Sequence, residues 1–204
     1  FIDDVARAVL RRAREPINEI NAEDELSVSK QIRDYFTSRG YRYLGEGRDQ
    51  IAFLSPRHTV VKVLGIGDPE REQVVLDYVN YFVKNQQNPY YPRIYNTGNF
   101  TVDGETYFVY EMEYLQEVAN DEDTLDFLEI LMWEIGMDRA TEYLENNPIP
   151  GNLGEDEIYG LVQTTENLLQ HLGTQIGAPL DLHNVENIRR RNNGHLVITD
   201  PFSL

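Results

Sequence analysis

Two carboxylates and one amide near the end of the chain have the residue types and spacing of a site for a hard cation. Asp181 and Asn187 precede one strand-like run, and Asp200 follows a second run. The turn between the runs is Asn193-Gly194, a pair that favours a two-residue hairpin because both positions adopt positive φ at little cost. A hairpin would bring its two ends together. Oxygen donors gathered there suit magnesium, which keeps coordination positions for phosphate oxygens.

An upstream lysine and glutamate could bind the phosphate end of a nucleotide. Lys62 lies inside the apolar run Val60–Leu64, where an unpaired buried ammonium would be costly. Glu72 borders the apolar face of the helix that follows, and it is the expected partner of Lys62. Two simpler readings stay open. Lys62 could reach solvent from the strand face, and Glu72 could be an acid favoured by the helix dipole.

Alternating apolar residues predict the antiparallel strands that would position these groups. A turn containing Gly45 and Gly47 joins the first two strands, and a turn at Asp103-Gly104 joins the last two. One helix begins at Asp68-Pro69 and carries an apolar stripe through Val75, Leu76, Val79 and Phe82. The five strands are expected at Tyr41–Leu44, Ile51–Leu54, Thr59–Leu64, Arg93–Phe100 and Glu105–Glu111.

The segments before and after this strand-rich region have helical periodicity. Before it we expect a helix over residues 1–14, and a second near 30–38 that is capped by Ser27 or Ser29. After it, an acidic loop from Gln116 to Thr124 is expected to link two lobes. Two further helices are then predicted, over Leu125–Asn146 and Glu155–Leu172, leading to the hairpin.

Composition and charge narrow the function classes. The 204 residues are 41% hydrophobic and 11% aromatic, as in a globular protein. With no cysteine, the chain has no disulfides, thiolate zinc sites or cysteine nucleophiles. A net charge of -17 repels nucleic acid and acidic membranes and favours a basic partner, although solubility alone also explains it. No run long enough to span a bilayer and no signal peptide is visible, so we expect a cytoplasmic protein.

The order of these motifs resembles that of the protein-kinase fold, from Tyr41 to the end of the chain. The terminal segment is most similar to the kinase-like proteins of tailed bacteriophages, and next to aminoglycoside phosphotransferases. The motifs that carry the resemblance are the glycine loop Gly45-x-Gly47-x-x-Gln50, the strand lysine Val60-Val61-Lys62, the helix acid Glu72, the hinge Tyr110–Leu115, the catalytic loop from Asp181 to Asn187 and the metal segment Ile198-Thr199-Asp200.

This resemblance implies an α+β, bilobal protein-kinase-like fold. Its N-lobe would be a five-stranded antiparallel sheet with one helix, and its C-lobe would be minimal, helical and end in a β-hairpin. The implied domains are an N-terminal helical extension at 1–40, the N-lobe at 41–115 and the C-lobe at 116–204.

The resemblance also implies ATP and magnesium as cofactors and assigns a role to each site residue. Lys62, held by Glu72, would bind the nucleotide phosphates, which the backbone around Gly45 and Gly47 would cradle. Adenine would lie against the backbone of Glu113 and Leu115. Asn187 and Asp200 would hold magnesium, while Asp181 would orient the acceptor hydroxyl and take its proton.

The sequence departs from the kinase pattern at several positions. Gln50 replaces the third loop glycine, and Pro201 follows the metal-binding aspartate where kinases have Phe-Gly. Five residues separate Asp181 from Asn187, where the kinase pattern has about four. The chain ends four residues after Asp200. We therefore expect either a chain that continues further or a minimal kinase without a peptide-docking platform.

Three functions stay open from the sequence. The leading one is an ATP-dependent phosphotransferase, a phage-type protein Ser/Thr kinase acting in the host cytoplasm. The second is a small-molecule kinase, which the lack of an activation segment favours. The third is a degenerate kinase fold that acts as an acidic binding module or inhibitor of a basic host protein, which the charge of -17 favours.

Overall fold

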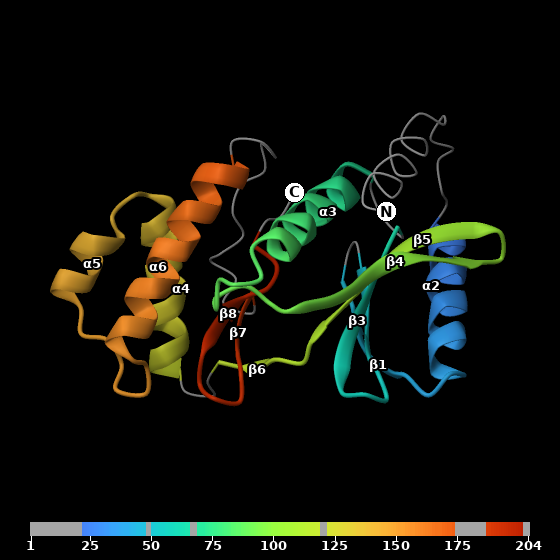
Figure 1. Cartoon of the computed structure of the whole chain (residues 1–204), viewed down its shortest axis with the longest axis horizontal. Coiled ribbons are helices and arrows are strands. Elements are labelled where there is room, and N and C mark those ends of the chain that lie inside the picture. Colours follow the sequence, from blue (N-terminus) through green and yellow to red (C-terminus); the bar gives the residue numbers. More distant parts are fainter. Residues whose placement is uncertain (1–21, 48–49, 66–68, 119–121, 174–186, 202–204) are drawn as a thin grey trace. The chain divides into compact units, whose positions relative to one another are not determined.

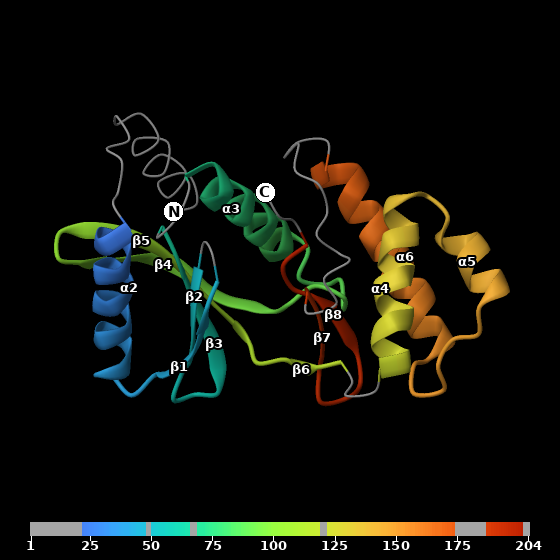
Figure 2. The same cartoon turned by 180° about the vertical axis from the view of Figure 1, so that it is seen from behind.

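The computed structural model describes residues 22–47, 50–65, 69–118, 122–173 and 187–201. Within these ranges the chain forms an α+β structure with five α-helices and two antiparallel sheets (Figures 1 and 2). It divides into two compact units. Unit 1 comprises Phe1–Gln73 and Ile94–Tyr114, and unit 2 comprises Val74–Arg93 and Leu115–Leu204. The predicted division at 1–40, 41–115 and 116–204 stays a prediction.

Unit 1 is built on a five-stranded antiparallel sheet, which confirms the α+β class and the predicted strand number. Its strand order is β1-β2-β3-β5-β4, so β3 and β5 are interior strands. The turn from β4 to β5 is at Asp103 and Gly104, which have φ of 51° and 88°. The strands are β1 (Arg42–Glu46), β2 (Gln50–Leu54), β3 (Thr59–Leu64), β4 (Ile94–Val102) and β5 (Glu105–Glu113).

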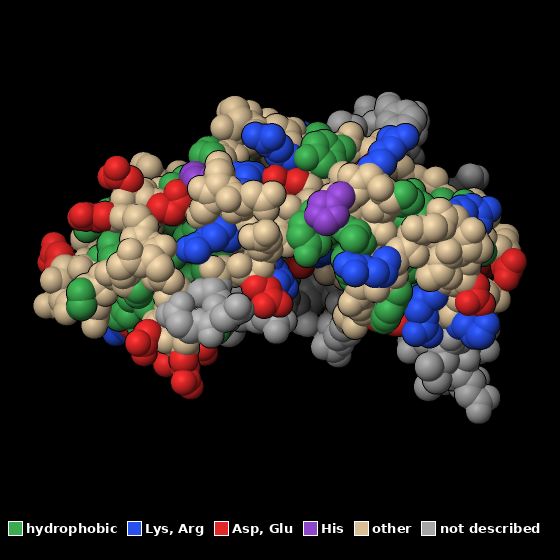
Figure 3. Space-filling model, turned by 90° about the horizontal axis from the view of Figure 1, so that it is seen from below, with side chains coloured by type: hydrophobic (Ala, Val, Ile, Leu, Met, Phe, Trp, Pro, Cys, Tyr) green, Lys and Arg blue, Asp and Glu red, His purple; other side chains and the backbone are tan. Residues whose placement is uncertain are grey.

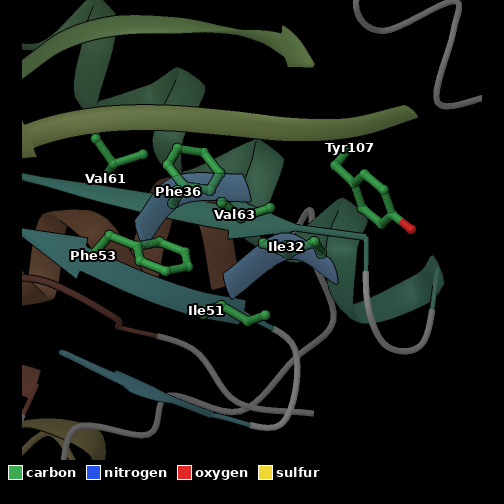
Figure 4. Packing of buried hydrophobic residues seen from close by; sticks show 7 residues of the cluster. All are labelled: Ile32, Phe36, Ile51, Phe53, Val61, Val63 and Tyr107. Carbon is green, nitrogen blue, oxygen red and sulfur yellow. The ribbon is translucent and has the colours of Figure 1, made fainter. Parts of the chain in front are cut away.

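Helix α2 (Ala22–Thr37) covers one face of this sheet through two large apolar side chains. Ile32 and Phe36 are buried there, and the Phe36 ring stacks on Phe53 with centroids 4.6 Å apart (Figure 4). The sheet side of this core is formed by Ile51, Phe53, Val61, Val63 and Tyr107. Because side chains alternate along a strand, the remaining residues of β2 and β3 point to the opposite face.

The predicted start of this helix is wrong. Neither Ser27 nor Ser29 is an N-cap, because the helix begins at Ala22 and both lie inside it. Ser29 is buried, and its hydroxyl donates instead to Oε1 of Glu46 at 2.5 Å. The helix predicted over residues 1–14 lies outside the described residues.

Helix α3 (Pro69–Lys84) begins in unit 1 and continues in unit 2, since the boundary falls between Gln73 and Val74. Its start at Pro69 confirms the prediction from Asp68-Pro69. The other helical elements of unit 2 are α4 (Glu122–Gly136), α5 (Ala140–Asn146), α6 (Glu155–Leu168) and the π-helical turn η1 (Leu169–Gly173).

Two predictions in unit 2 need correction. The stretch Leu125–Asn146 is two helices rather than one, because the chain turns between them at Asp138, which has a φ of 58°. The segment Gln116–Thr124 is not a simple loop. It contains strand β6 (Gln116–Glu117), and α4 already begins at Glu122.

The predicted hairpin is present and lies in the second sheet, of order β6-β7-β8. Its turn is not the predicted two-residue turn, because the Arg191 N–H donates to the His195 carbonyl at 2.8 Å and Asn193 does not have the positive φ that Gly194 has. Strands β7 (Ile188–Arg190) and β8 (Leu196–Ile198) pair antiparallel, with Ile188 opposite Ile198. All three residues of β8 are fully buried, so the hairpin belongs to the core of unit 2. In the part of the chain that the structure describes, no helix combines the length and apolar character needed to cross a membrane.

Candidate active site

The open end of the β7–β8 hairpin brings two predicted metal ligands into neighbouring positions. The backbone N–H of Thr199 donates to the carbonyl oxygen of Asn187 at 2.8 Å, and the Thr199 hydroxyl donates to the same oxygen at 3.0 Å. These bonds extend the antiparallel ladder one pair beyond Ile188 and Ile198. Asn187 therefore lies across the ladder from Thr199, and Asp200 follows directly.

A buried tyrosine from helix α3 fixes the carboxylate of Asp200. The Tyr78 hydroxyl donates to Oδ1 of Asp200 at 2.9 Å, and Tyr78 is only 2% exposed. No motif in the sequence marks this residue as part of the site. The sequence nevertheless predicts that Tyr78 is buried, since it falls between Val75 and Phe82 on the apolar stripe of α3. A buried tyrosine hydroxyl usually has a hydrogen-bond partner.

The chemistry of this pair fits a hard cation. A carboxylate and an amide offer the oxygen donors that magnesium prefers, and few protein ligands suffice because water and phosphate complete its shell. Among the described residues, no group of three or more His, Asp or Glu side chains forms a metal site. Asp181, the predicted catalytic base, lies outside the described residues.

The hairpin is anchored to the segment that follows α3. The guanidinium of Arg191 donates to the backbone oxygens of Pro89 and Tyr91, the latter from Nη2 at 2.9 Å. The backbone N–H of Ile198 donates to the carbonyl of Tyr90 at 2.9 Å. The Arg191 side chain thus satisfies carbonyl groups of a neighbouring segment.

Helix α6 holds the other strand of the hairpin through one glutamate. Oε1 of Glu157 accepts from the Leu196 N–H at 2.5 Å, and Oε2 lies 2.8 Å from Nδ1 of His195. Tyr90 packs closely over the same helix, where a Cβ added at Gly160 would lie 2.0 Å from its hydroxyl oxygen. The position of Asp200 is therefore determined by α3, α6 and the loop between α3 and β4.

In unit 1, Lys62 lies on the sheet face opposite the α2 core. It pairs with Ala52 on β2 and Tyr110 on β5, and residues that pair across antiparallel strands share a face. Its side chain is partly buried, while Val61 and Val63 on either side point into the α2 core. The lysine is thus on an interior strand and not on an exposed sheet edge.

Glu72 is the fourth residue of α3, and it is 9% exposed. A carboxylate this buried ordinarily has an ionic or hydrogen-bonding partner, because its desolvation would otherwise be costly. The helix dipole alone is a weak account of a buried acid in the first turn. The pairing of Glu72 with Lys62 stays a prediction.

The glycine segment differs in part from its expected form. Gly45 is not in the turn but in β1, opposite Ala52 and beside a bulge that follows Tyr43. Gly47 begins the turn, and its N–H donates to the carbonyl of Gln50 at 2.9 Å. Among the described residues, no heavy atom would lie within 4 Å of a Cβ at Gly45, and at Gly47 the nearest atom would be 3.9 Å away. Packing against this part of the chain therefore requires neither glycine.

The two predicted adenine-contacting residues lie at the end of the interior strand β5 and just after it. Glu113 is the last residue of β5, is 8% exposed and pairs with Thr59. Leu115 is partly buried and lies between β5 and β6. Near Glu113, the carboxylate of Glu111 accepts from Thr59 Oγ1 at 2.5 Å, so the strand end is held by side chains as well as by the ladder.

Comparisons with known proteins give weak likenesses to phosphotransferases. No protein-family model matches the chain, and no curated protein matches it. The structure of a microcompartment-associated aminopropanol kinase is 13% identical, with a TM-score of 0.38 over 78% of this chain. The chain spans 63% of that kinase's length. The APH(2'')-IIa complex with streptomycin and ATP is 17% identical over 90% of this chain and 71% of the other, with a TM-score of 0.35.

A third solved structure gives a similar result. ADP-bound APH(2'')-Ib, an aminoglycoside phosphotransferase, is 17% identical over 83% of this chain and 69% of its own, with a TM-score of 0.34. These likenesses are too low to establish a common fold or activity.

Proposed function

We propose that the protein is an ATP- and magnesium-dependent phosphotransferase with a protein-kinase-like fold. The observation that carries the proposal is the end of the β7–β8 hairpin, where Asn187 is paired with Thr199 and Asp200 is held by Tyr78. A carboxylate fixed by a buried hydroxyl keeps its geometry without the metal. Such preorganisation is what charge stabilisation in phosphoryl transfer requires.

The arrangement of unit 1 supports a nucleotide-binding role for its residues. Unit 1 has a partly buried lysine on the interior strand β3 and a buried acid at the start of α3. In kinases a lysine of this kind binds the nucleotide phosphates and is held by such an acid. Packing against the described residues does not require Gly45 or Gly47 to be glycine. A segment without side chains lets a ligand approach the backbone closely, so phosphate binding explains their presence.

In this proposal each residue has a specific part. Lys62, oriented by Glu72, binds the nucleotide phosphates, and Glu113 and Leu115 contact adenine through their backbones. Asn187 and Asp200 hold magnesium, which neutralises charge on the phosphates when bound. Asp181 orients the acceptor hydroxyl and accepts its proton. The acceptor is a Ser or Thr hydroxyl of a host protein if the resemblance to the phage kinase-like proteins holds.

The test is stabilisation and transfer measured on the same variants. ATP with magnesium should raise the melting temperature of the wild type, because a ligand that binds only the native state stabilises it by RT ln(1 + [L]/Kd). Lys62→Met and Asp200→Asn should both remove this rise and abolish transfer of labelled phosphate. Lys84→Met and Asp138→Asn are matched controls, since both side chains are exposed and neither residue has a part in the proposed site.

Asp181→Asn should behave differently from these two variants. It should retain stabilisation by magnesium and ATP but lose transfer, because its role is in the chemical step. Transfer to a basic protein, compared with a panel of aminoglycosides and sugars, distinguishes protein from small-molecule acceptors. Full transfer activity in Lys62→Met would refute the proposal.

A further inference from the structure

Helix α4 of unit 2 and the residue directly after it expose three large apolar side chains in consecutive turns. Ile130, Trp133 and Met137 are 46%, 52% and 54% exposed. Ile130 and Trp133 lie in α4, and Met137 directly follows its last residue, with its backbone N–H donating to the carbonyl of Trp133 at 3.2 Å. Their spacing of three and four residues therefore places them on one side of the helix, and we call them the α4 stripe. Single exposed hydrophobic residues are normal on a protein surface, whereas a row of three indicates contact with another molecule.

The α4 stripe lies apart from the core face of its helix. The opposite side of α4 carries residues that are at most 6% exposed and form the core contacts of the helix. These residues are Phe127, Leu128, Leu131, Met132 and Ile135. The helix is therefore already fixed by a complete apolar face, and the stripe is additional to it.

Acidic side chains surround the stripe. Asp126 and Glu129 are exposed and lie one helical turn before Ile130 and Trp133, respectively. Between residues 122 and 146 the sequence has eight acids, and Arg139 is the single basic residue. The Arg139 Nε is already 2.7 Å from Oε2 of Glu134. Seen from below, acidic side chains gather at the end of unit 2 formed by α4, α5 and α6 (Figure 3, left).

We propose that the α4 stripe binds a basic amphipathic helix of another protein. Its apolar side would cover Ile130, Trp133 and Met137, while its lysines and arginines would face the flanking carboxylates. A helix suits the stripe because two helices pack through side chains spaced three and four residues apart. The proposal rests on this surface alone and does not depend on phosphotransferase activity.

The same charges disfavour two other occupants. A second copy would bring an equally acidic surface against the first, and like charges at an interface oppose association. An anionic membrane would be repelled for the same reason. The outcomes of the test include a second copy and a further part of the same chain.

The protein supplies its own reporter for the test, because Trp133 is the single tryptophan of the chain. A Lys/Leu peptide with leucines at helical spacing should shift Trp133 emission to shorter wavelength as it covers the ring. A Glu/Leu peptide with the same spacing and a scrambled Lys/Leu peptide should cause no shift. Added salt should weaken the Lys/Leu complex, since screening reduces its charge complementarity.

Two pairs of variants locate the binding surface. The double variant Ile130→Gln/Met137→Gln keeps the reporter and should weaken peptide binding roughly tenfold or more, as loss of central apolar contacts does. Tyr159→Gln is its control, because Tyr159 is 46% exposed on α6. Asp126→Asn/Glu129→Gln should reduce the affinity for the Lys/Leu peptide and make binding less dependent on salt. Glu155→Gln/Asp156→Asn removes the same charge from α6 and should leave both the affinity and its salt dependence unchanged.

Three results would overturn the proposal. One is an absent shift, or a shift that is equal in all variants. Another is a dimer in sedimentation, without peptide, that Ile130→Gln/Met137→Gln dissociates, which would identify a second copy as the occupant. The third is Trp133 shielded from acrylamide quenching in the full chain before peptide is added, because the chain would then cover the stripe itself.

Discussion

The Tyr78 hydroxyl donates a hydrogen bond of 2.9 Å to Oδ1 of Asp200, although the two residues are 122 positions apart in the sequence. Tyr78 is anchored in the apolar side of α3, and Asp200 follows the last strand of the chain. The bond therefore fixes a predicted metal ligand to the part of α3 that belongs to unit 2. The folded protein itself therefore orients the Asp200 carboxylate, without a bound metal.

Replacing Tyr78 by Phe should weaken magnesium binding clearly while lowering the stability of the fold only modestly. Phe keeps nearly the whole buried side chain and removes one hydrogen bond to a charged group, so the free energy of unfolding should fall by about 1–2 kcal/mol. The magnesium concentration that gives half of the ATP-dependent stabilisation should rise in the same variant. Thermal melts at graded magnesium concentrations measure both effects.

Tyr95→Phe is the control for this experiment, because Tyr95 is 57% exposed on β4. It should leave the magnesium dependence unchanged. If Tyr78→Phe has the magnesium dependence of the wild type, Tyr78 has a purely structural part and the proposed preorganisation is wrong.

Alanine at Gly45 should separate ligand binding from stability. No atom of the residues that the structure describes would lie within 4 Å of the new methyl group, and the φ of Gly45 is not in the left-handed region. The free energy of unfolding should change by less than about 0.5 kcal/mol. ATP should bind more weakly to this variant if the phosphates lie against the backbone at Gly45. Calorimetric titration with ATP and magnesium measures the change in affinity.

Gly160→Ala is the opposite case and a useful comparison. Its methyl group would meet the Tyr90 hydroxyl oxygen at 2.0 Å, so the variant should lose about 1–3 kcal/mol of stability through overpacking. Equal ATP affinity in wild type and Gly45→Ala would remove the glycine segment from the proposed site.

Much of the fold could be predicted from local sequence features. Alternation of apolar residues predicted strands such as β3 (Thr59–Leu64) at their observed bounds, because one sheet face is buried against α2. Asn193-Gly194 marked the terminal hairpin, where Gly194 has a φ of 90°. These features are encoded within a few residues of each other.

What could not be predicted depends on distant partners. Periodicity placed Tyr78 on a buried stripe, but nothing near it in the sequence identifies Asp200 as its acceptor. The short strand β6 exists because Gln116 and Glu117 pair with Arg190 and Arg189. Local polarity favoured a loop there. Long-range pairing of this kind overrides local propensity.

High pH should destabilise unit 2 through a buried phenol. Burial, and next the hydrogen bond with Tyr81, raises the pKa of Tyr91 above its ordinary value of about 10. Tyr91 is 3% exposed. Because the unfolded chain then releases this proton at lower pH than the folded one, the stabilisation is complete below about pH 10 and is lost as pH rises further.

Tyr91→Phe should therefore flatten the decrease in stability between about pH 10 and pH 12. The measurement is urea unfolding at several alkaline pH values, with Tyr95→Phe as the exposed control. An alkaline decrease of equal size in Tyr91→Phe would show that other groups cause it.

The contact between Ser29 and Glu46 should matter for the glycine segment, although α2 lies on the sheet face away from Lys62. Ser29 donates to Oε1 of Glu46 at 2.5 Å, and Nη1 of Arg33 lies 3.9 Å from Oε2. Glu46 is the last residue of β1 and directly precedes Gly47. The helix thus holds one end of the proposed phosphate-binding turn.

Ser29→Ala should lower the free energy of unfolding by about 1–2 kcal/mol, because it removes a hydrogen bond to a carboxylate from a buried side chain. It should also increase amide hydrogen exchange at Gly47 and weaken ATP binding, since the turn would have to be ordered by the ligand. Ser38→Ala is a matched control, because the Ser38 hydroxyl is exposed and bonds only to groups of the α2 end. If exchange at Gly47 and ATP affinity are both unchanged in Ser29→Ala while stability falls, α2 stabilises the sheet without positioning the turn.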